Sequence, residues 1–118
     1  PWIKINPNYV TINAADQVGR EDSIFTYYKT LIAMRKQYPV FVDGRFEMLV
    51  ADHPEVFAYT RTTDDSELVV ICNFFDKEIT CPVEKDWDNY ELILTNEKEN
   101  KDASILKPYE ARMYLLRK

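Results

Sequence analysis

The stretch Leu68-Val69-Val70-Ile71-Cys72-Asn73-Phe74-Phe75 is the densest apolar segment of the chain, and it predicts a central β-strand. Side chains alternate between the two faces of a strand, and here both alternating sets are apolar. Both faces must therefore be covered, as in the middle of a sheet. The polar clusters Asp64-Asp65-Ser66 and Asp76-Lys77 bound the segment at an ordinary strand length. We expect the rest of the chain to be arranged around this strand.

The next apolar segment, Glu78–Val83, predicts a hairpin partner for this strand across Asp76-Lys77. That register places Cys72 opposite Cys81, on a face that would form the core, while the opposite face would pack against a helix or a neighbouring domain. Two cysteines do not make a disulfide framework, so we expect both thiols buried and reduced, with a disulfide as the alternative. Asp-Lys suits a tight hairpin turn poorly, and a longer loop is the alternative there.

Four further segments share the features of short strands. Each is rich in Val, Ile, Tyr or Phe and is bounded by clusters of Asp, Asn, Pro, Lys or Glu. The segments are Arg45–Ala51, Val56–Thr62, Tyr90–Thr95 and Glu110–Leu116. Strands at this spacing predict a mainly β fold, an antiparallel Greek-key β-sandwich over residues 39–118.

One amphipathic α-helix is predicted before the β domain, over residues 22–38. Asp22 or Ser23 can cap its N-terminus, and Pro39 ends it. Its apolar side chains cover nearly half of the helical circumference: Ile24, Phe25, Tyr27, Tyr28, Leu31, Ile32 and Met34. So wide an arc needs two covering bodies, and we expect one of them to lie outside this chain. Residues 1–21, rich in Pro and Asn, predict an irregular segment.

Composition narrows the class of protein. The chain has 118 residues, 46% of them hydrophobic and 30% charged, and its net charge is −5. This balance is typical of a globular domain, and the absence of a basic cluster in the sequence disfavours nucleic acid as a partner. No apolar run approaches the length of a membrane span. The chain begins Pro1-Trp2 without secretory features, so we expect a piece of a longer cytoplasmic protein.

No residue pattern predicts a catalytic, cofactor-binding or metal site within this chain. The single histidine, His53, lies in a predicted solvated turn, and one histidine does not make a zinc site. Cys72 and Cys81 have no basic sequence neighbours that would favour a thiolate. The 20 Asp and Glu residues fall mostly in predicted loops, which indicates a solubilising surface rather than the fixed carboxyl pair of a glycosidase.

Trp87 and Tyr90 lie between two predicted strands and allow two interpretations. The two rings could form a flat platform on which a sugar ring stacks, or they could anchor the start of a strand against the core. We favour the core. The alternative function is therefore a carbohydrate-binding module that uses Trp87 and Tyr90.

Two groups of motifs span the chain. The first runs from Pro1-Trp2-Ile3-Lys4-Ile5-Asn6-Pro7-Asn8-Tyr9 through Ile12-Asn13-Ala14 to Asp22-Ser23-Ile24-Phe25. The second contains Val56–Arg61, Leu68–Phe74 and Leu106-Lys107-Pro108-Tyr109-Glu110-Ala111-Arg112. In this order they resemble the C-terminal end of bacterial α-glucosidases of the α-amylase superfamily, a group with oligo-1,6-glucosidase, dextran glucosidase and trehalose-6-phosphate hydrolase. The resemblance covers essentially the whole chain.

The resemblance implies a division into two parts. Residues 1–38 would be the tail of a catalytic (β/α)8 barrel, with the helix over residues 22–38 as its last helix. Residues 39–118 would be the C-terminal antiparallel β domain. In this family an Asp nucleophile, a Glu acid/base and a second Asp act by a retaining mechanism, and their motifs lie upstream of Pro1.

The resemblance also implies a function for the longer protein. It would hydrolyse α-glucosidic bonds, α-1,6 bonds above all, in short oligosaccharides, without a cofactor. No residue of this chain matches the catalytic motifs, so we expect the chain alone to be inactive and to stabilise the barrel of the same polypeptide. A dimer through the helix 22–38 face is the alternative partner arrangement.

Overall fold

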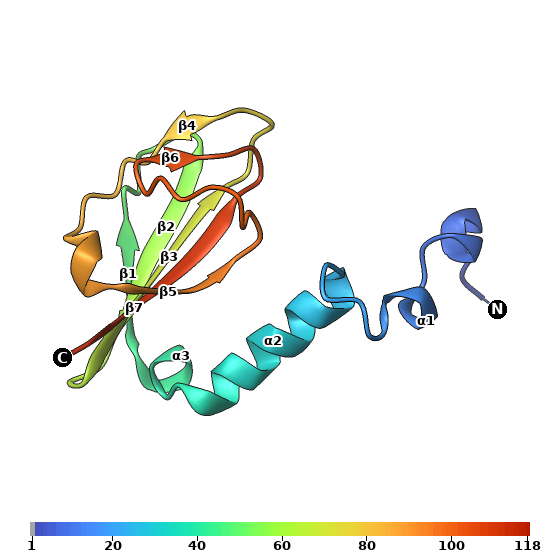
Figure 1. Cartoon of the computed structure of the whole chain (residues 1–118), viewed down its shortest axis with the longest axis horizontal. Helices are drawn as coiled ribbons and strands as arrows, with labels where there is room; N and C mark the ends of the chain where they lie inside the picture. The colour runs from blue at the N-terminus through green and yellow to red at the C-terminus, as the bar shows by residue number, and fades with distance from the viewer. Residues whose placement is uncertain (1) are drawn as a thin grey trace. The chain divides into compact units, whose positions relative to one another are not determined.

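A computed structural model describes residues 2–118, and the chain divides into two compact units, one ending at Tyr38 and the other covering Pro39–Lys118 (Figure 1). The first unit contains the 3-10 helix η1 (Pro7–Val10) and the helices α1 (Ala14–Gln17) and α2 (Ile24–Gln37). The expectation of an irregular segment over residues 1–21 is therefore only partly right. Side chains of Asn6 and Asn13 cap the two single-turn helices, which gives these short segments helical order.

Helix α2 agrees with the predicted helix. The Oγ of Ser23 accepts a hydrogen bond from the backbone N–H of Thr26 at 3.1 Å, and the helix ends at Gln37, two residues before Pro39. None of its residues is buried: Ile24 is 69% exposed and Ile32 is 55% exposed. The wide apolar arc of this helix is therefore largely uncovered within the described chain.

The second unit is built on a five-stranded sheet with the strand order β1-β2-β3-β7-β5. Its antiparallel strands are β1 (Arg45–Leu49), β2 (Val56–Thr62), β3 (Ser66–Asn73), β5 (Glu91–Thr95) and β7 (Ala111–Arg117). Two short strands, β4 (Ile79–Thr80) and β6 (Ile105–Leu106), form a second sheet, and the helices α3 (Val40–Asp43) and η2 (Trp87–Asn89) complete the unit. The predicted mainly antiparallel β fold is confirmed, and β3 is its central strand.

The predicted hairpin between residues 68–75 and 78–83 is wrong. Strand β3 pairs with β2 and β7, so Cys72 lies opposite Phe57 on one side and Ala111 on the other. Of the expected partner strand only Ile79 and Thr80 are extended in a ladder, and they pair with β6. Cys72 and Cys81 therefore do not face each other across a hairpin, and both are free thiols.

Asn73 explains why the chain leaves the sheet after β3. Its buried side chain donates to the carbonyl oxygens of Lys77 at 2.8 Å and Lys107 at 2.9 Å, and its Oδ1 accepts from the N–H of Phe75 at 3.0 Å. These bonds replace the hairpin turn and direct the chain toward the second sheet. Strand β1 also ends two residues earlier than predicted, because Val50 adopts a left-handed conformation with φ 45°.

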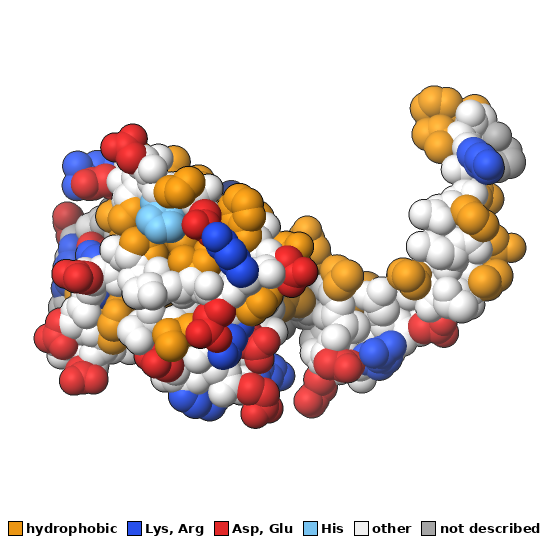
Figure 2. All heavy atoms as spheres, turned by 90° about the horizontal axis from the view of Figure 1, so that it is seen from above, with side chains coloured by type: hydrophobic (Ala, Val, Ile, Leu, Met, Phe, Trp, Pro, Cys, Tyr) orange, Lys and Arg blue, Asp and Glu red, His pale blue; other side chains and the backbone are white. Residues whose placement is uncertain are grey.

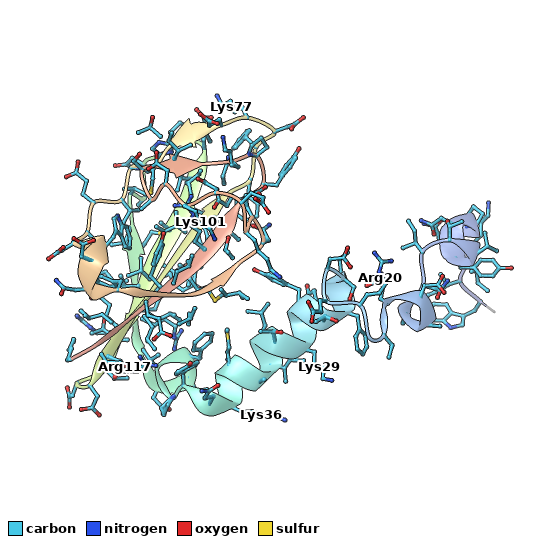
Figure 3. The ribbon with its side chains drawn as sticks, viewed as in Figure 1. Arg20, Lys29, Lys36, Lys77, Lys101 and Arg117 are labelled. Carbon is cyan, nitrogen blue, oxygen red and sulfur yellow. The ribbon has the colours of Figure 1, made fainter. Side chains whose placement is uncertain are left out.

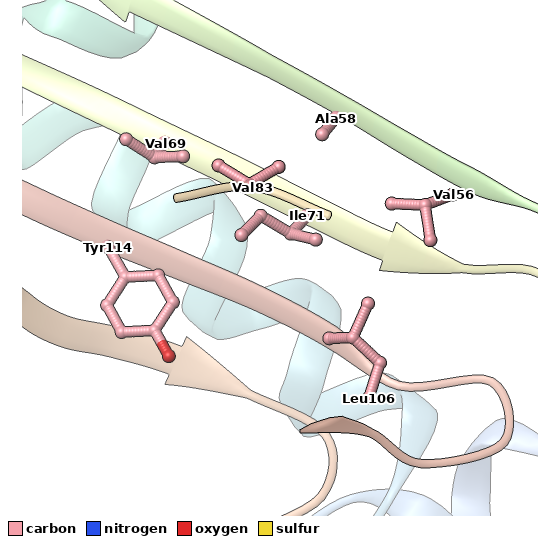
Figure 4. Close-up of a cluster of buried hydrophobic side chains, with 7 residues drawn as sticks. All are labelled: Val56, Ala58, Val69, Ile71, Val83, Leu106 and Tyr114. Atoms are coloured by element: carbon pink, nitrogen blue, oxygen red, sulfur yellow. The ribbon is translucent and has the colours of Figure 1, made fainter. Parts of the chain in front are cut away.

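The core lies between the two sheets (Figure 4). On the large sheet it is formed by Val56, Ala58, Val69, Ile71 and Tyr114, and Val83 and Leu106 pack on them from the facing layer. We call this side of the sheet the covered face. The assignment of faces is the reverse of the prediction, since Val69 and Ile71 lie in the core and Cys72 lies on the opposite side.

Candidate functional site

The side of the large sheet opposite to the core carries the most distinctive surface of the second unit. Residues that pair directly across neighbouring strands point to the same face, and the registers place Phe46 with Arg61, Met48 with Tyr59, and Phe57 with Cys72. The pairs Tyr59–Val70 and Val70–Met113 continue this face across β3 and β7. We call it the open face.

Four aromatic rings form a continuous strip on the open face. Ring centroids lie 5.2 Å apart for Phe46 and Tyr59, 5.6 Å for Phe57 and Tyr59, and 6.4 Å for Phe57 and Phe74. All three pairs are tilted, which is a favourable arrangement for aromatic rings. We call Phe46, Tyr59, Phe57 and Phe74 the aromatic strip. Phe46 is 51% exposed and Phe74 is 65% exposed, so the strip offers apolar area to a partner.

A shallow hollow of about 210 Å³ adjoins the strip. Met48, His53, Phe57, Phe74 and Phe75 contribute to its lining, and Figure 2 shows apolar side chains gathered around the histidine on this side of the β domain. His53 was predicted to lie in a solvated turn, but its ring is half-buried. Its Nδ1 accepts hydrogen bonds from the backbone N–H groups of Glu55 at 3.2 Å and Val56 at 3.0 Å, so the ring holds the turn before β2.

Helix α3 covers the other end of the open face. It contacts β2 and β3, and Val40 is 2% exposed. The guanidinium of Arg61 donates from Nε to the carbonyl oxygen of Val40 at 3.2 Å and from Nη2 to that of Val42 at 3.0 Å. A Cβ on Gly44 would lie 2.5 Å from the carbonyl oxygen of Val40, so only glycine fits where α3 meets β2.

Trp87 and Tyr90, the predicted alternative sugar platform, are half-buried and pack against the core cluster. Their rings lie edge to face at 65°, and Trp87 is 4.4 Å from the ring of Tyr114. This is not the flat surface that stacking of one sugar ring on both side chains would need. The geometry agrees with the favoured interpretation, in which both residues anchor the start of β5 against the core.

Glu67 joins Tyr90 to Lys85. Its Oε1 accepts from Tyr90 Oη at 2.7 Å and from Lys85 Nζ at 2.7 Å. Burial opposes ionisation of Glu67, but these two hydrogen bonds outweigh it and hold the pKa of its carboxyl below the ordinary value. Burial of Tyr90 and the neighbouring Glu67 raise the pKa of the Tyr90 hydroxyl. This cluster therefore keeps an ordinary structural ion pair rather than a protonated carboxylic acid.

Glu110 and Arg112 form a buried ion pair that the sequence did not reveal. Arg112 Nε lies 2.5 Å from Glu110 Oε1, and the two side chains are 3% and 0% exposed. Arg112 also donates to the carbonyl oxygens of Asp102 and Ile105, and Glu110 Oε2 accepts from Asn100 Nδ2 at 2.9 Å. All of these groups connect β7 with the loop before it. The motif residues therefore hold the fold of the β domain.

The two cysteines lie in environments that disfavour the thiolate. Cys72 lies on the open face and Cys81 beside the core, and burial raises the pKa of both thiols, which favours the unreactive thiol form. No group of three His, Cys, Asp or Glu residues among residues 2–118 could hold a metal ion. No helix in the described part of the chain is long and apolar enough to cross a membrane.

The basic side chains labelled on the β domain in Figure 3 are dispersed. Figure 3 shows Lys77 and Arg117 at opposite ends of this unit with Lys101 between them, so these three cations do not form one patch. Lys77 Nζ lies 2.6 Å from Glu55 and Arg117 Nη1 lies 2.6 Å from Glu91, so each is paired with an acid. The apolar open face is therefore the better candidate for a binding surface.

Sequence comparison divides the chain close to Gly44. Residues 1–44 match the family described as "Alpha amylase, catalytic domain", and residues 46–113 match "Maltogenic Amylase, C-terminal domain". The chain is 41% identical to an oligo-1,6-glucosidase of Heyndrickxia coagulans, with all of this chain and 21% of that protein covered. It is 36% identical to a trehalose-6-phosphate hydrolase of Bacillus subtilis, covering 100% of this chain and 22% of that protein.

Solved structures give the same picture. A trehalose-6-phosphate hydrolase of Bacillus licheniformis superposes with a TM-score of 0.83 at 33% identity, over 100% of this chain and 22% of that one. An isomaltulose synthase of Klebsiella sp. LX3 has a TM-score of 0.83 at 34% identity, over 99% and 22% of the two chains. The chain thus spans about a fifth of the length of the relatives that it matches.

Proposed function

The chain belongs to the α-amylase family of glucosidases, as its motifs predicted, and we propose that residues 39–118 are a non-catalytic domain that stabilises the catalytic domain of the same polypeptide. The observation that carries this proposal is the order of the two matches. The catalytic-domain match ends at residue 44, and the C-terminal-domain match begins at residue 46. Within the catalytic-domain match, the first compact unit, residues 1–38, is then the end of the catalytic barrel, with α2 as its last helix.

Two features of the first unit support its assignment to a barrel. Helix α2 exposes Ile24, Phe25, Tyr28 and Ile32 along its length, as expected of an element whose covering partners are absent. Some of these side chains line a groove of about 670 Å³ with Ala14 and Gln17. We propose the rest of the barrel as the occupant of this face, with a dimer through the same face as the competing arrangement.

For the longer protein we propose hydrolysis of α-glucosidic bonds, with α-1,6 bonds in short oligosaccharides as the preferred substrate. Support comes from the names of the relatives, which include oligo-1,6-glucosidases in Heyndrickxia coagulans and Bacillus cereus. A cytoplasmic location is part of the same proposal. The two free cysteines support it, because unpaired thiols are typical of a reducing compartment.

The catalytic carboxylates are proposed to lie outside this chain. A retaining glycosidase holds two carboxyl groups about 5–5.5 Å apart on either side of the scissile bond. Three of the less exposed carboxylates here are instead paired with cations: Glu110 with Arg112, Glu67 with Lys85, and Glu55 with Lys77. These acids are engaged in holding the β domain together.

The experiment compares two proteins with p-nitrophenyl α-glucoside and isomaltose as substrates. The 118-residue chain alone should release no product. A fusion, in which this chain replaces the matching region of the Heyndrickxia coagulans enzyme, should be active and should inactivate at a lower temperature once residues 39–118 are deleted. Turnover by the chain alone that is lost on substitution of one of its acids would contradict the proposal. Light scattering with and without residues 1–38 tests the dimer.

A further inference from the structure

We propose that the open face of the sheet is the surface by which the β domain docks against the catalytic domain of the same polypeptide. This inference rests on the function proposed above and adds the residues that make the contact. The docking surface consists of the aromatic strip (Phe46, Tyr59, Phe57 and Phe74) together with Met48, Cys72 and Met113, which lie on the same face by strand register.

A segment matched by the catalytic-domain family already occupies one end of this face. The match runs to residue 44, yet Pro39–Gly44 folds within the second compact unit. Within that unit Val40 is buried, and Arg61 donates hydrogen bonds to the carbonyl oxygens of Val40 and Val42. Leu68 and Leu115, in register with Arg61, are 1% and 3% exposed at this end of the face.

The exposure of side chains changes along the same face. Beyond α3 the side chains become accessible: Phe57 is 40% exposed, Met48 is 43% exposed and Phe74 is 65% exposed. The other side of the sheet has its own cover, because Val83, Leu106 and Trp87 pack on it. Aromatic residues and Met are enriched in the buried centres of protein interfaces, and large exposed apolar patches mark interaction sites.

The order of the two domains in the sequence identifies the occupant of this face. This chain spans about a fifth of the relatives' length, so most of each relative lies outside the matched region. The catalytic domain adjoins the β domain in sequence at α3, and α3 lies on the open face itself. The aromatic strip lies on the same face of the sheet as α3, so a domain that contacts this face beside α3 also reaches the strip. The catalytic domain is therefore the occupant, and a second copy of this chain is the competing one.

The test uses the fusion enzyme described above and the 118-residue chain, each carrying single substitutions. Phe46→Lys and Phe74→Lys introduce a charge into the aromatic strip at residues that are 51% and 65% exposed. The matched control is Leu92→Lys on β5, where Leu92 is 42% exposed and lies in register with Tyr114 on the other side of the sheet. The variant Phe74→Leu keeps an apolar side chain on the strip.

In the 118-residue chain, the two strip variants should unfold at the same urea concentration as the control within error. In the fusion, they should lower the temperature of half-inactivation by several degrees, while Leu92→Lys and Phe74→Leu leave it unchanged. Burial of an unpaired lysine in an interface explains the difference. Strip variants that behave like the control in an active fusion would overturn the docking surface and leave the proposed function standing.

Two further outcomes are decisive. A fusion with the unmodified chain that folds but shows no α-glucosidase activity would contradict the proposed function and this inference together. A 118-residue chain that dimerises by light scattering, and becomes monomeric in Phe46→Lys and Phe74→Lys without any effect of these variants in the fusion, would assign the open face to a second copy. That result would overturn the catalytic domain as its occupant.

Discussion

The two units of the chain use similar apolar residues with opposite results. Ile32 in α2 is 55% exposed, whereas Ile71 in β3 is 1% exposed. Helix α2 is held by local contacts, including the Ser23 cap and a 3.0 Å hydrogen bond from Phe25 N–H to Gln17 Oε1. The β domain is held by contacts between residues far apart in sequence. An amphipathic pattern thus defines an element locally, but burial of that pattern needs a partner, which only the β domain contains.

The largest expected effect tests the long-range contacts of the β domain. Arg112→Leu leaves the carboxylate of Glu110 buried without its cation, and should destabilise the domain by about 3–5 kcal/mol. Urea unfolding followed by circular dichroism measures the change. Arg117→Leu is the control, because its ion pair with Glu91 is more than half exposed and should contribute at most about 1 kcal/mol. Equal costs for the two variants would refute this assignment.

A matched pair of isoleucine substitutions tests the comparison directly. Ile71→Ala removes a side chain from the filled core and should cost about 2–5 kcal/mol. Ile32→Ala removes one from the exposed face of α2, where alanine is also the better helix former, so the helix should be unchanged or slightly more stable. Urea unfolding of the β domain and helical content of α2 are the two measurements. A core-sized loss from Ile32→Ala would show that α2 is already covered in the 118-residue chain.

The two glycines are needed for different reasons. Gly44 has no room for a Cβ against α3, so Gly44→Ala should cost about 1–3 kcal/mol through overpacking. Gly19 has a φ of 84° in open space, so Gly19→Ala should cost about 1–2 kcal/mol through backbone strain alone. Asparagine separates the two causes, because it tolerates left-handed backbone. Gly19→Asn should recover most of the loss, whereas Gly44→Asn should deepen it.

The smallest effect is a pH dependence of the β domain. The pKa of Glu67 is lowered in the folded state, so its ion pair stabilises the domain above the ordinary carboxyl pKa and the contribution is lost as the pH falls through the lowered value. Glu67→Gln should therefore flatten this acidic part of the stability curve by at most about 1 kcal/mol. Urea midpoints between neutral pH and pH about 3 test it. An identical acid response in wild type and Glu67→Gln would exclude the contribution.

Local signals predicted the helix and most strands. Ser23 and Pro39 defined α2 closely, because capping and proline act within a few residues. The strand pattern located β2, β3, β5 and β7 to within about two residues at each end. The partner of β3 could not be predicted in the same way. Both of its faces are apolar, so alternation did not decide which one forms the core. Of its two partners, β2 and β7, the second lies far along the chain.

The aromatic strip of the open face could not be predicted from single segments of the sequence. Phe46 and Met48 alternate in β1, and Phe57 and Tyr59 alternate in β2, which indicates that each strand has one aromatic or apolar side. Only the register of the two strands joins these sides into a strip. The Arg61 contacts to Val40 and Val42 depend on the short helix α3, which the helix and strand patterns of the sequence do not indicate.

Helix α3 also affects where the C-terminal domain of this chain can be exchanged with that of a relative by recombination. A crossover after Gly44 would follow the boundary between the two family matches. It would, however, combine Val40 and Gly44 of one parent with the strand of the other parent that contains Arg61 and packs against Gly44. A crossover between Tyr38 and Pro39 would transfer α3 together with the sheet that it contacts. Natural or designed hybrids joined at the earlier point should therefore fold more often, although the later point coincides with the boundary between the two family matches.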